Sequence, residues 1–304
     1  MVLSLPDGPD AGAAVVIVAF AVAARLDLRV REVPDRLWIV VALVGTVLGA
    51  IAVVPDGALG VGLWLLAAGF VLEHLLPWDA RFADSGRADL VEAGVYAVVL
   101  AVVGLLVVRL GVGGSGVPVP VVAVVLTTVF ARGLFAAGIL FGGADAKAVM
   151  VAGLAVPFFA RPLLWVPTGA LPITSLLPFA VNLLLDAALI SVVAPVALAI
   201  RNAARDEFRW RDGFTTFTIP VAELPRRWVW VRDPEVPIDR AREEAIETSE
   251  EDRAWRRQLA ADLAATGRTR VRVGPQLPFV VFLLAGSIAA VLFGNVVLDL
   301  LLAR

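Results

Sequence analysis

The sequence predicts an all-α polytopic membrane protein with about eight transmembrane helices and a small α+β cytoplasmic module before the last helix. Two observations carry this prediction: 60% of the 304 residues are hydrophobic, and several apolar runs reach the roughly 20 residues that a helix needs to cross a bilayer. The expected spans are 11–26, 37–54, 58–77, 91–110, 118–141, 146–165, 173–200 and 278–302. The first run has no basic region before it, so we expect a retained span and not a cleaved signal peptide.

The seventh run is followed by a long polar stretch, which predicts the one soluble module. Pro157 and Pro162 lie inside the sixth run, so that helix is expected to be kinked or short. The expected parts are a transmembrane bundle over 1–200, a cytoplasmic module over 201–275 and a final transmembrane helix over 276–304. Three segments of the module have the β-branched and aromatic character of strands, and one reads as a charged helix. These are Phe214–Ile219, Trp228–Arg232 and Thr269–Val273 for the strands and Pro237–Ala265 for the helix.

Basic residues gather in alternate loops, which predicts an orientation in the membrane. The loops on the basic side hold Arg25, Arg29, Arg31 and Arg36, then Arg81 and Arg87, then Lys147, then the 201–272 segment. Arg109 and Arg161 are exceptions on the other side. We therefore expect a multi-pass protein of the cell membrane with the module in the cytoplasm and both termini outside. The same count puts Asp27 and Asp145 at the cytoplasmic face.

Composition excludes several classes of protein and of chemistry. The net charge is −2 and no long basic run is present, so no nucleic-acid partner is expected. The absence of cysteine rules out disulfides, thiolate metal sites and thiol nucleophiles. His74 is the only histidine, which excludes a metal site built from several histidines. We expect neither a metal nor a cofactor, and carboxylates remain the available hydrolytic groups.

One short segment, Gly142-Gly143-Ala144-Asp145-Ala146-Lys147, places an aspartate and the only lysine of the chain between apolar runs. Ionisable residues at a membrane edge are costly, and by default they mark a functional site. The two glycines leave room for another chain to approach the backbone closely. A purely structural alternative is that Asp145 caps the helix that follows.

A second aspartate, Asp27, follows the first apolar run at the same expected membrane face. Two carboxylates that share a site do not both ionise, so one can activate a water while the protonated one donates to a carbonyl. Asp35 is a nearby alternative, although its place after Pro34 is more typical of a helix cap or a surface charge.

These residues carry a family resemblance. The segment Asp27-Leu-Arg-Val-Arg-Glu-Val-Pro34-Asp35 resembles the first catalytic motif of the prepilin peptidases, in which an aspartate and basic residues precede a hydrophobic-Pro-Asn/Asp helix start. The 142–147 segment is similar to the second motif, Gly-x-Gly-Asp-x-Lys. The cytoplasmic module and the 274–279 junction look similar to the archaeal branch, the prearchaellin and prepilin peptidases.

The resemblance implies a GxGD-type membrane aspartic endopeptidase with Asp27 and Asp145 as its catalytic residues. It further implies motif support or substrate contact from Gly142, Gly143, Lys147, Pro34, Pro275 and Leu277. The implied partners are the lipid bilayer and type IV pilin-like or archaellin precursors, each with a short basic leader before an apolar helix. Bacterial relatives also methylate their product and carry a cysteine-bound zinc module, which this cysteine-free chain lacks. The resemblance does not imply a particular oligomeric state.

One position departs from the family pattern, and other functions stay open. Ala144 stands where the family has glycine, and its Cβ disfavours left-handed backbone, so we expect either a different local turn or a loop that moves to become active. One alternative is a transporter or channel in which Asp145, Asp186 and Asn182 line a path. Another is a catalytically silent relative. Asp186 and Asn182 lie one helical turn apart, which also fits a structural hydrogen bond. We expect no functional role for Glu73, His74 and Glu92 near the interface or for Asp299 near the outer end.

Overall fold

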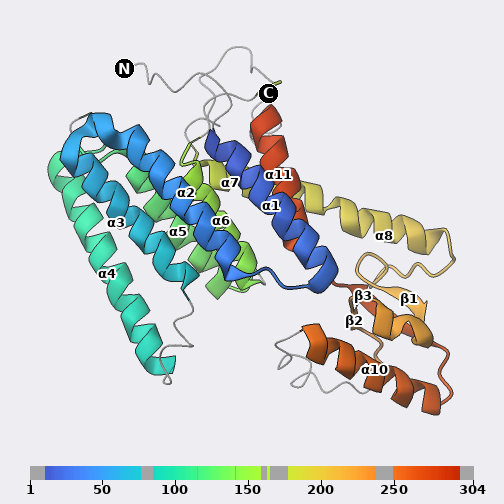
Figure 1. The fold of residues 1–304 in the computed structure, drawn as a ribbon. Coiled ribbons are helices and arrows are strands. Elements are labelled where there is room, and N and C mark those ends of the chain that lie inside the picture. The colour runs from blue at the N-terminus through green and yellow to red at the C-terminus, as the bar shows by residue number, and fades with distance from the viewer. Residues whose placement is uncertain are drawn as a thin grey trace. The chain divides into compact units, whose positions relative to one another are not determined.

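The computed structural model describes most of the chain, and that part divides into two compact units (Figure 1). The described residues are 11–76, 85–114, 116–140, 142–158, 163–164, 177–236 and 249–294. Unit 1 comprises Met1–Arg25, Val33–Ala188 and Phe279–Arg304, and unit 2 comprises Leu26–Glu32 and Leu189–Pro278. Unit 2 therefore begins earlier than the expected module at 201. It also takes in the end of the first helix, which was not expected from the sequence.

Unit 1 is helical because its apolar runs satisfy their backbone hydrogen bonds internally, as lipid requires. Its helices are α1 Ala11–Val30, α2 Asp35–Val53, α3 Gly57–Leu75, α4 Ser85–Leu110, α5 Val119–Ala136, α6 Gly143–Ala155, α7 Phe179–Ser191 and α11 Phe279–Phe293. The last residues of α1 and α7 count with unit 2. Proline precedes both α2 and α5 as the N-cap, at Pro34 and Pro118. The short helix η1, Val54–Asp56, turns the chain between α2 and α3, which pack on each other.

Five stretches among the described residues are long and apolar enough to cross a membrane, so a helical membrane protein is confirmed at that level. They are Ala11–Val30, Asp35–Leu75, Leu90–Leu110, Val119–Ala136 and Phe179–Ala203. The 41-residue stretch holds two helices, α2 and α3, and thus two of the expected spans. The expected number of eight stays a prediction, because α6 has 13 residues and α11 has 15. Helix α6 ends at Ala155, two residues before Pro157. Pro162 lies outside the described residues.

Helix α6 is the most enclosed helix of unit 1. Nine of its 13 residues are buried, on all sides of the helix. Small residues allow its neighbours to come close, as is common between helices in membranes. A Cβ added at Gly12 of α1 would lie 2.2 Å from the carbonyl oxygen of Ala155, and one at Gly45 of α2 would lie 2.9 Å from the Cα of Ala155. On the α5 side, a Cβ at Gly153 would lie 2.7 Å from the Cγ2 of Thr127.

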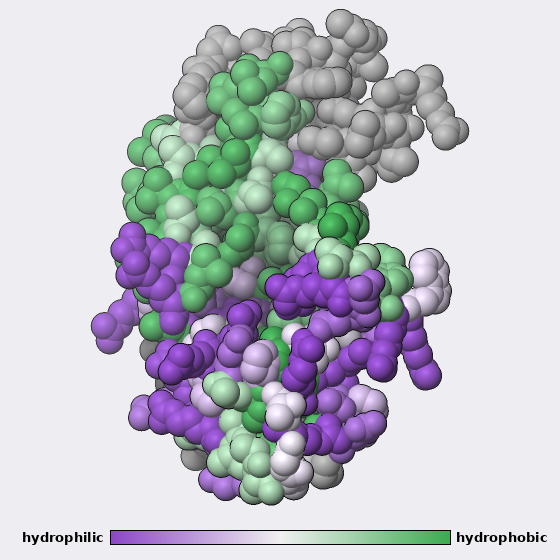
Figure 2. Space-filling model, turned by 90° about the vertical axis from the view of Figure 1, so that its right-hand side faces the viewer, coloured by the Kyte–Doolittle hydropathy of each residue, from purple (hydrophilic) through white to green (hydrophobic). Residues whose placement is uncertain are grey.

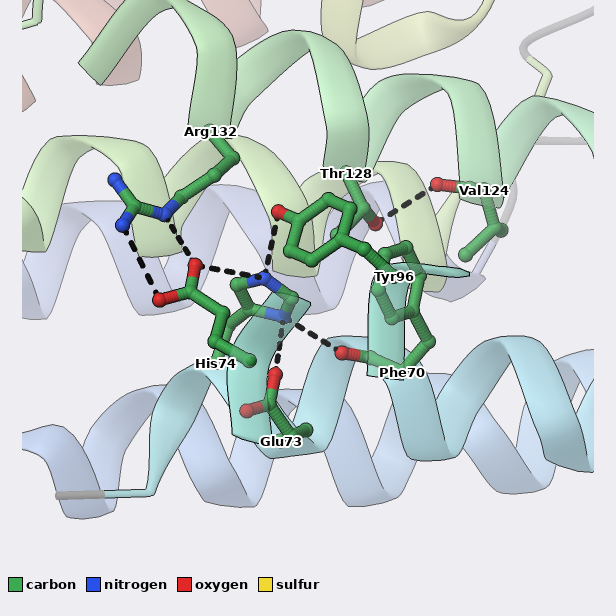
Figure 3. Close-up of polar contacts among 8 residues, drawn as sticks. Phe70, Glu73, His74, Tyr96, Val124, Thr128 and Arg132 are labelled. Atoms are coloured by element: carbon green, nitrogen blue, oxygen red, sulfur yellow. Dashed lines mark hydrogen bonds and ion pairs between the residues drawn. The ribbon is translucent and has the colours of Figure 1, made fainter. Parts of the chain in front are cut away.

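Helix α4 is joined to helices α3 and α5 of the same unit by a polar network around His74 (Figure 3). Only 11% of its apolar stretch is buried, against 28–39% for the other four, so apolar packing holds it weakly. The Nδ1–H of His74 in α3 donates to the carbonyl of Phe70 at 2.7 Å, and its Nε2 lies 2.7 Å from the hydroxyl of Tyr96 in α4. Glu92 of α4 accepts from Arg132 of α5 at 2.6 Å. Residues treated as interfacial in the sequence thus join three helices.

Replacing Tyr96 by Phe is expected to lower the thermal stability of the protein in detergent. The ring contacts of Tyr96 with Phe70 and His74, at 4.9 and 5.2 Å between centroids, survive the change. The Nε2 of His74 loses its donor, and a buried polar atom left unsatisfied costs about 1–3 kcal/mol. The matched control is Thr128→Val, because the buried Thr128 hydroxyl only adds a bond to the Val124 carbonyl of its own helix. Equal thermal unfolding midpoints for the two variants would contradict the role of the His74 network in holding α4.

Unit 2 is a small α+β unit with its own apolar core. Its elements are α8 Val193–Ala203, β1 Phe217–Pro220, η3 Val221–Arg226, β2 Val229–Val231, α10 Ser249–Ala265 and β3 Arg270–Pro275. The antiparallel sheet has the order β1-β3-β2, and Val273 of β3 pairs with Phe217 on one side and Val231 on the other. The strands lie within or next to the segments expected from the sequence. Residues 237–248 of the expected charged helix lie outside the described residues.

The surfaces of the two units differ in polarity, as Figure 2 shows. Hydrophobic residues cover the helices of unit 1, whereas hydrophilic residues dominate over the strands and α10 of unit 2. In unit 2, the side chain of Asn202 at the end of α8 donates to the carbonyls of Gly213 and Thr216 at 2.8 and 2.7 Å. These bonds fix the loop that leads into β1.

Candidate functional site

The second motif forms the start of α6. Gly142 is the N-cap, with φ −107° and ψ 130°, and Asp145 lies in the first turn of the helix. A carboxylate in that position is stabilised by the unpaired N–H groups and the positive end of the helix dipole. Asp145 is half-buried. It is therefore a first-turn residue and not the N-cap that the structural alternative assigned.

The two motif glycines differ in what surrounds them. A Cβ added at Gly142 would lie 2.9 Å from the Oδ2 of Asp145, so the carboxylate of Asp145 occupies the space that a side chain at 142 would need. Gly143 is exposed and has nothing within 4 Å of an added Cβ. Neither glycine has a positive φ. The first glycine thus makes room for Asp145, whereas the second has open space beside it within this chain.

Ala144 has ordinary helical backbone. It lies inside the first turn of α6, and its φ is not positive. A methyl group carries no conformational penalty there, because alanine is the most favourable residue in a helix. Whether the turn differs from that of the family motif stays a prediction.

Lys147 joins the second motif to the end of the first. Its Nζ donates to the Oδ1 of Asp35 at 2.6 Å, across the contact between α6 and α2. Asp35 is the first residue of α2, and Pro34 is its N-cap. The sequence interpretation treated Asp35 as a cap or a surface charge, and the structure gives it an ion pair between helices. The signal was available, since a lone lysine beside apolar runs needs an acidic partner.

Asp27 lies in the last turn of α1, in unit 2. Its side chain is 18% exposed, and its Oδ1 lies 3.5 Å from the Nη1 of Arg31, one turn further on. Asp145 lies in unit 1. The pairing of the two carboxylates, which the sequence predicted, stays a prediction.

The junction before the last helix connects β3 to α11. Strand β3 ends at Pro275, and α11 begins at Phe279. The backbone N–H of Gln276 donates to the carbonyl of Trp228 at 3.2 Å, which ties the junction to the residue before β2. Leu277 is 51% exposed. An apolar side chain that contributes so little to a core is available for contact with another molecule.

Further polar residues of the apolar runs are Asp186 and Asn182, Asp299, and Arg132. Asp186 and Asn182 of α7 are almost completely buried, at 1% and 3% exposed. Asp299 lies outside the described residues. Arg132, which sequence reasoning passed over, binds Glu92 in the network that holds α4. It is the only charged residue in the fifth apolar run, and that was the signal for it.

Unit 2 contains a second charged cluster that the sequence did not reveal. Arg256 of α10 is 1% exposed and lies 2.7 Å from Asp252, one turn earlier. Burial raises the pKa of Asp252, against the lowering effect of Arg256, and burial lowers the pKa of Arg256. The guanidinium of Arg256 lies 4.4 Å from the ring centroid of Trp228. Trp228 thus contacts both the buried Arg256 and, through its carbonyl, the Gln276 junction.

No protein-family model matches this chain, and no curated protein matches it either. Within the described ranges, no three histidine, aspartate or glutamate side chains are grouped so that they could hold a metal ion. The motif residues of unit 1 are therefore Asp145 and the ion pair of Lys147 with Asp35, and those of unit 2 are Asp27 and the exposed Leu277.

Proposed function

We propose that the chain is a membrane aspartic endopeptidase that removes the leader peptides of pilin-like or archaellin-like precursors at the cytoplasmic membrane face. The observation that carries the proposal is the bond between Lys147 and Asp35. It joins residues 112 positions apart, and these are the closing residues of the two motifs that resemble the prepilin peptidases. The distribution of arginine supports the orientation, with unit 2 in the cytoplasm and both termini outside.

The mechanism uses Asp27 and Asp145 as one acid–base pair. One carboxylate is ionised and takes a proton from a water molecule, which attacks the scissile carbonyl. The other keeps its proton, donates a hydrogen bond to the carbonyl oxygen and later protonates the leaving amine. The helix dipole of α6 favours the ionised form at Asp145. Leu277 and Pro275 contact the apolar part of the precursor.

The transporter alternative has one observation in its favour, the burial of Asp186 and Asn182 in α7. An ionisable residue inside a membrane helix often marks a transport path. The two functions respond differently to Asp186→Asn. A peptidase that uses Asp27 and Asp145 should retain cleavage to within about twofold, as the replaced group takes no part in proton transfer.

The direct test is cleavage of a synthetic precursor by the purified protein. The substrate is a peptide with a short basic leader followed by an apolar helix, mixed with the protein in detergent or in lipid vesicles. We expect one cut after the leader, identified by the masses of both products. Vesicles that contain the Asp145→Asn variant provide the blank. If the wild-type protein leaves the peptide intact between pH 4 and 8, the proposal is wrong.

Replacing Gly142 by Ala is expected to reduce kcat/KM at least about tenfold without unfolding the protein. The new Cβ displaces the carboxylate of Asp145, which is a flexible group, so that the site and not the fold absorbs the change. The matched control is Gly143→Ala, which has open space and a helical position where alanine is favoured. The control should keep wild-type kcat/KM and an equal or higher melting temperature. Equal activity losses in the two variants would contradict the steric argument.

Replacing Leu277 by Ala is expected to raise the KM for the precursor several-fold while kcat and the melting temperature stay the same. The side chain is exposed, so its truncation removes contact with substrate and not core packing. Ile200→Ala in α8 is the control, because Ile200 is similarly exposed at 65% in the same unit. An unchanged KM in Leu277→Ala would leave the junction without a role in substrate binding.

A further inference from the structure

Arg31 occupies a backbone position that an arginine rarely adopts. It follows directly after α1 and has a φ of 62°, in the left-handed region. Its N–H donates to the carbonyl of Asp27 at 3.1 Å, which closes the last turn of the helix. Glycine is the preferred residue for such a helix end. A side chain that remains in this conformation has to be held by its surroundings, and such positions gather at functional sites.

The guanidinium of Arg31 contacts three separate segments of unit 2. It lies 3.5 Å from the Oδ1 of Asp27 in α1. It donates to the carbonyl of Gln276, in the junction before α11. It also lies 5.6 Å from the ring centroid of Trp228, which precedes β2. The side chain is 14% exposed, so it is largely shielded from water.

Trp228 is itself held in place by the module. Its ring faces Arg253 and Arg256 of α10, at 5.2 and 4.4 Å from the ring centroid. Arg256 is buried, pairs with Asp252 and also donates to the carbonyl of Arg227. Arginine stacks on aromatic faces and binds several acceptors in one plane, which lysine does not. A continuous series of contacts therefore runs from α10 through Trp228 and Arg31 to Asp27.

We propose that Arg31 is a positioning residue through which the soluble module fixes the end of α1 and the carboxylate of Asp27. The module then serves to hold one half of the acid–base pair and the Gln276 junction in a single rigid group. The role of Arg31 in holding the end of α1 to the module follows from these contacts alone. Its catalytic part rests on the proposed peptidase function.

The structural part is tested by distances between spin labels in unit 2. The chain has no cysteine, so Leu28→Cys and Arg257→Cys give two labelling sites without background. Both positions are exposed, one at the end of α1 and one on α10. In Arg31→Gly the glycine relieves the backbone strain while the guanidinium is lost. We expect its distance distribution to become at least twice as broad, with an equal or higher melting temperature.

Two further variants complete the distance measurement. Trp228→Leu should broaden the distribution as Arg31→Gly does, because it removes the next contact in the series. Arg29→Ala removes the same charge from an exposed helical position two residues earlier and should leave the distribution unchanged. A distribution in Arg31→Gly as narrow as that of the unsubstituted chain would overturn the inference. Equal broadening in Arg29→Ala would do so as well.

The catalytic part is tested with the precursor peptide. Arg31→Gly should lower kcat about 10- to 100-fold with little change in KM, because misplacement of a reacting group affects the chemical step. The basic limb of its kcat/KM profile should move to higher pH, since a nearby cation favours ionisation of Asp27, the carboxyl that has to keep its proton. Other charged groups near Arg31 and Trp228 are Asp252, Arg253 and Arg256 of α10. They are unchanged in this variant, so the shift in the pH profile reports the loss of Arg31.

The outcomes separate the two proposals. A wild-type kcat and an unmoved basic limb in Arg31→Gly would overturn the catalytic part. If the wild-type protein cuts no precursor at all, the peptidase proposal fails, and the spin-label distances still decide whether Arg31 holds α1 to the module.

Discussion

Asp27→Asn and Asp145→Asn are each expected to reduce precursor cleavage by roughly 10³-fold or more while the protein stays folded. The carboxamide keeps the volume of the carboxylate and part of its hydrogen bonding, but it neither ionises nor transfers a proton at neutral pH. The measurement is kcat/KM for the synthetic precursor. Elution volume in detergent and melting temperature confirm that each variant is folded.

The double variant should be no less active than either single one, because residues that act as a unit are not additive. The wild-type protein should show a bell-shaped pH profile whose two limbs belong to the pair. Asp35→Asn is the matched control. Its amide oxygen still accepts from Lys147, so most activity should remain. If Asp145→Asn cuts the precursor at a rate near that of the wild type, the carboxylate-pair mechanism fails and the transporter alternative gains.

The largest expected effect on stability belongs to Gly49→Ala, in the contact between α2 and α3. A Cβ at Gly49 would lie 1.8 Å from the Cζ2 of Trp64. The ring of Trp64 is fully buried, and its Nε1–H donates to the carbonyl of Thr46 at 2.9 Å, so the ring cannot move aside. Overpacking of a close-packed interior costs about 1–3 kcal/mol and occasionally more. We expect a melting temperature in detergent lower by several degrees and a reduced yield of monodisperse protein.

Gly62→Ala in α3 is the control for this variant. Gly62 is exposed, and an added Cβ would have nothing within 4 Å. Alanine in the middle of a helix is more favourable than glycine by about 1 kcal/mol in water, so this variant should be as stable as the wild type or more stable. If Gly49→Ala has the same melting temperature as the Gly62→Ala control, the close packing of α2 on α3 at Gly49 is contradicted.

The elements of this protein were more predictable than their contacts. Apolar runs and proline positions indicated the helices, and β-branched segments indicated the three strands, because these features act over a few residues. Asp145 was correctly expected at the start of a helix. Its relation to Gly142 was not, since periodicity does not say where a carboxylate folds back. Ala144 lies in ordinary helical backbone, and its effect on the turn that the family has there stays a prediction.

Interactions between distant segments account for the rest. The ion pair between Lys147 and Asp35 depends on the packing of α6 on α2, and no local pattern determines that packing. Arg31 reads in the sequence as one of several basic loop residues. Its left-handed backbone and its contact with Trp228 depend on the tertiary structure of unit 2. Unit 2 also takes in Leu26–Glu32, which in the sequence reads only as the end of the first span and the start of a basic loop.

The shortness of α6 has a consequence for the way water reaches Asp145. A helix of 13 residues is about 20 Å long, whereas the hydrocarbon core of a bilayer is about 30 Å thick. Because neighbouring helices enclose α6, protein and not lipid surrounds its ends, and backbone without helical hydrogen bonds is tolerated there only in protein or beside a water-filled cavity. Asp145 stands at one end of this short helix, so we expect water to reach it between helices and not through the lipid.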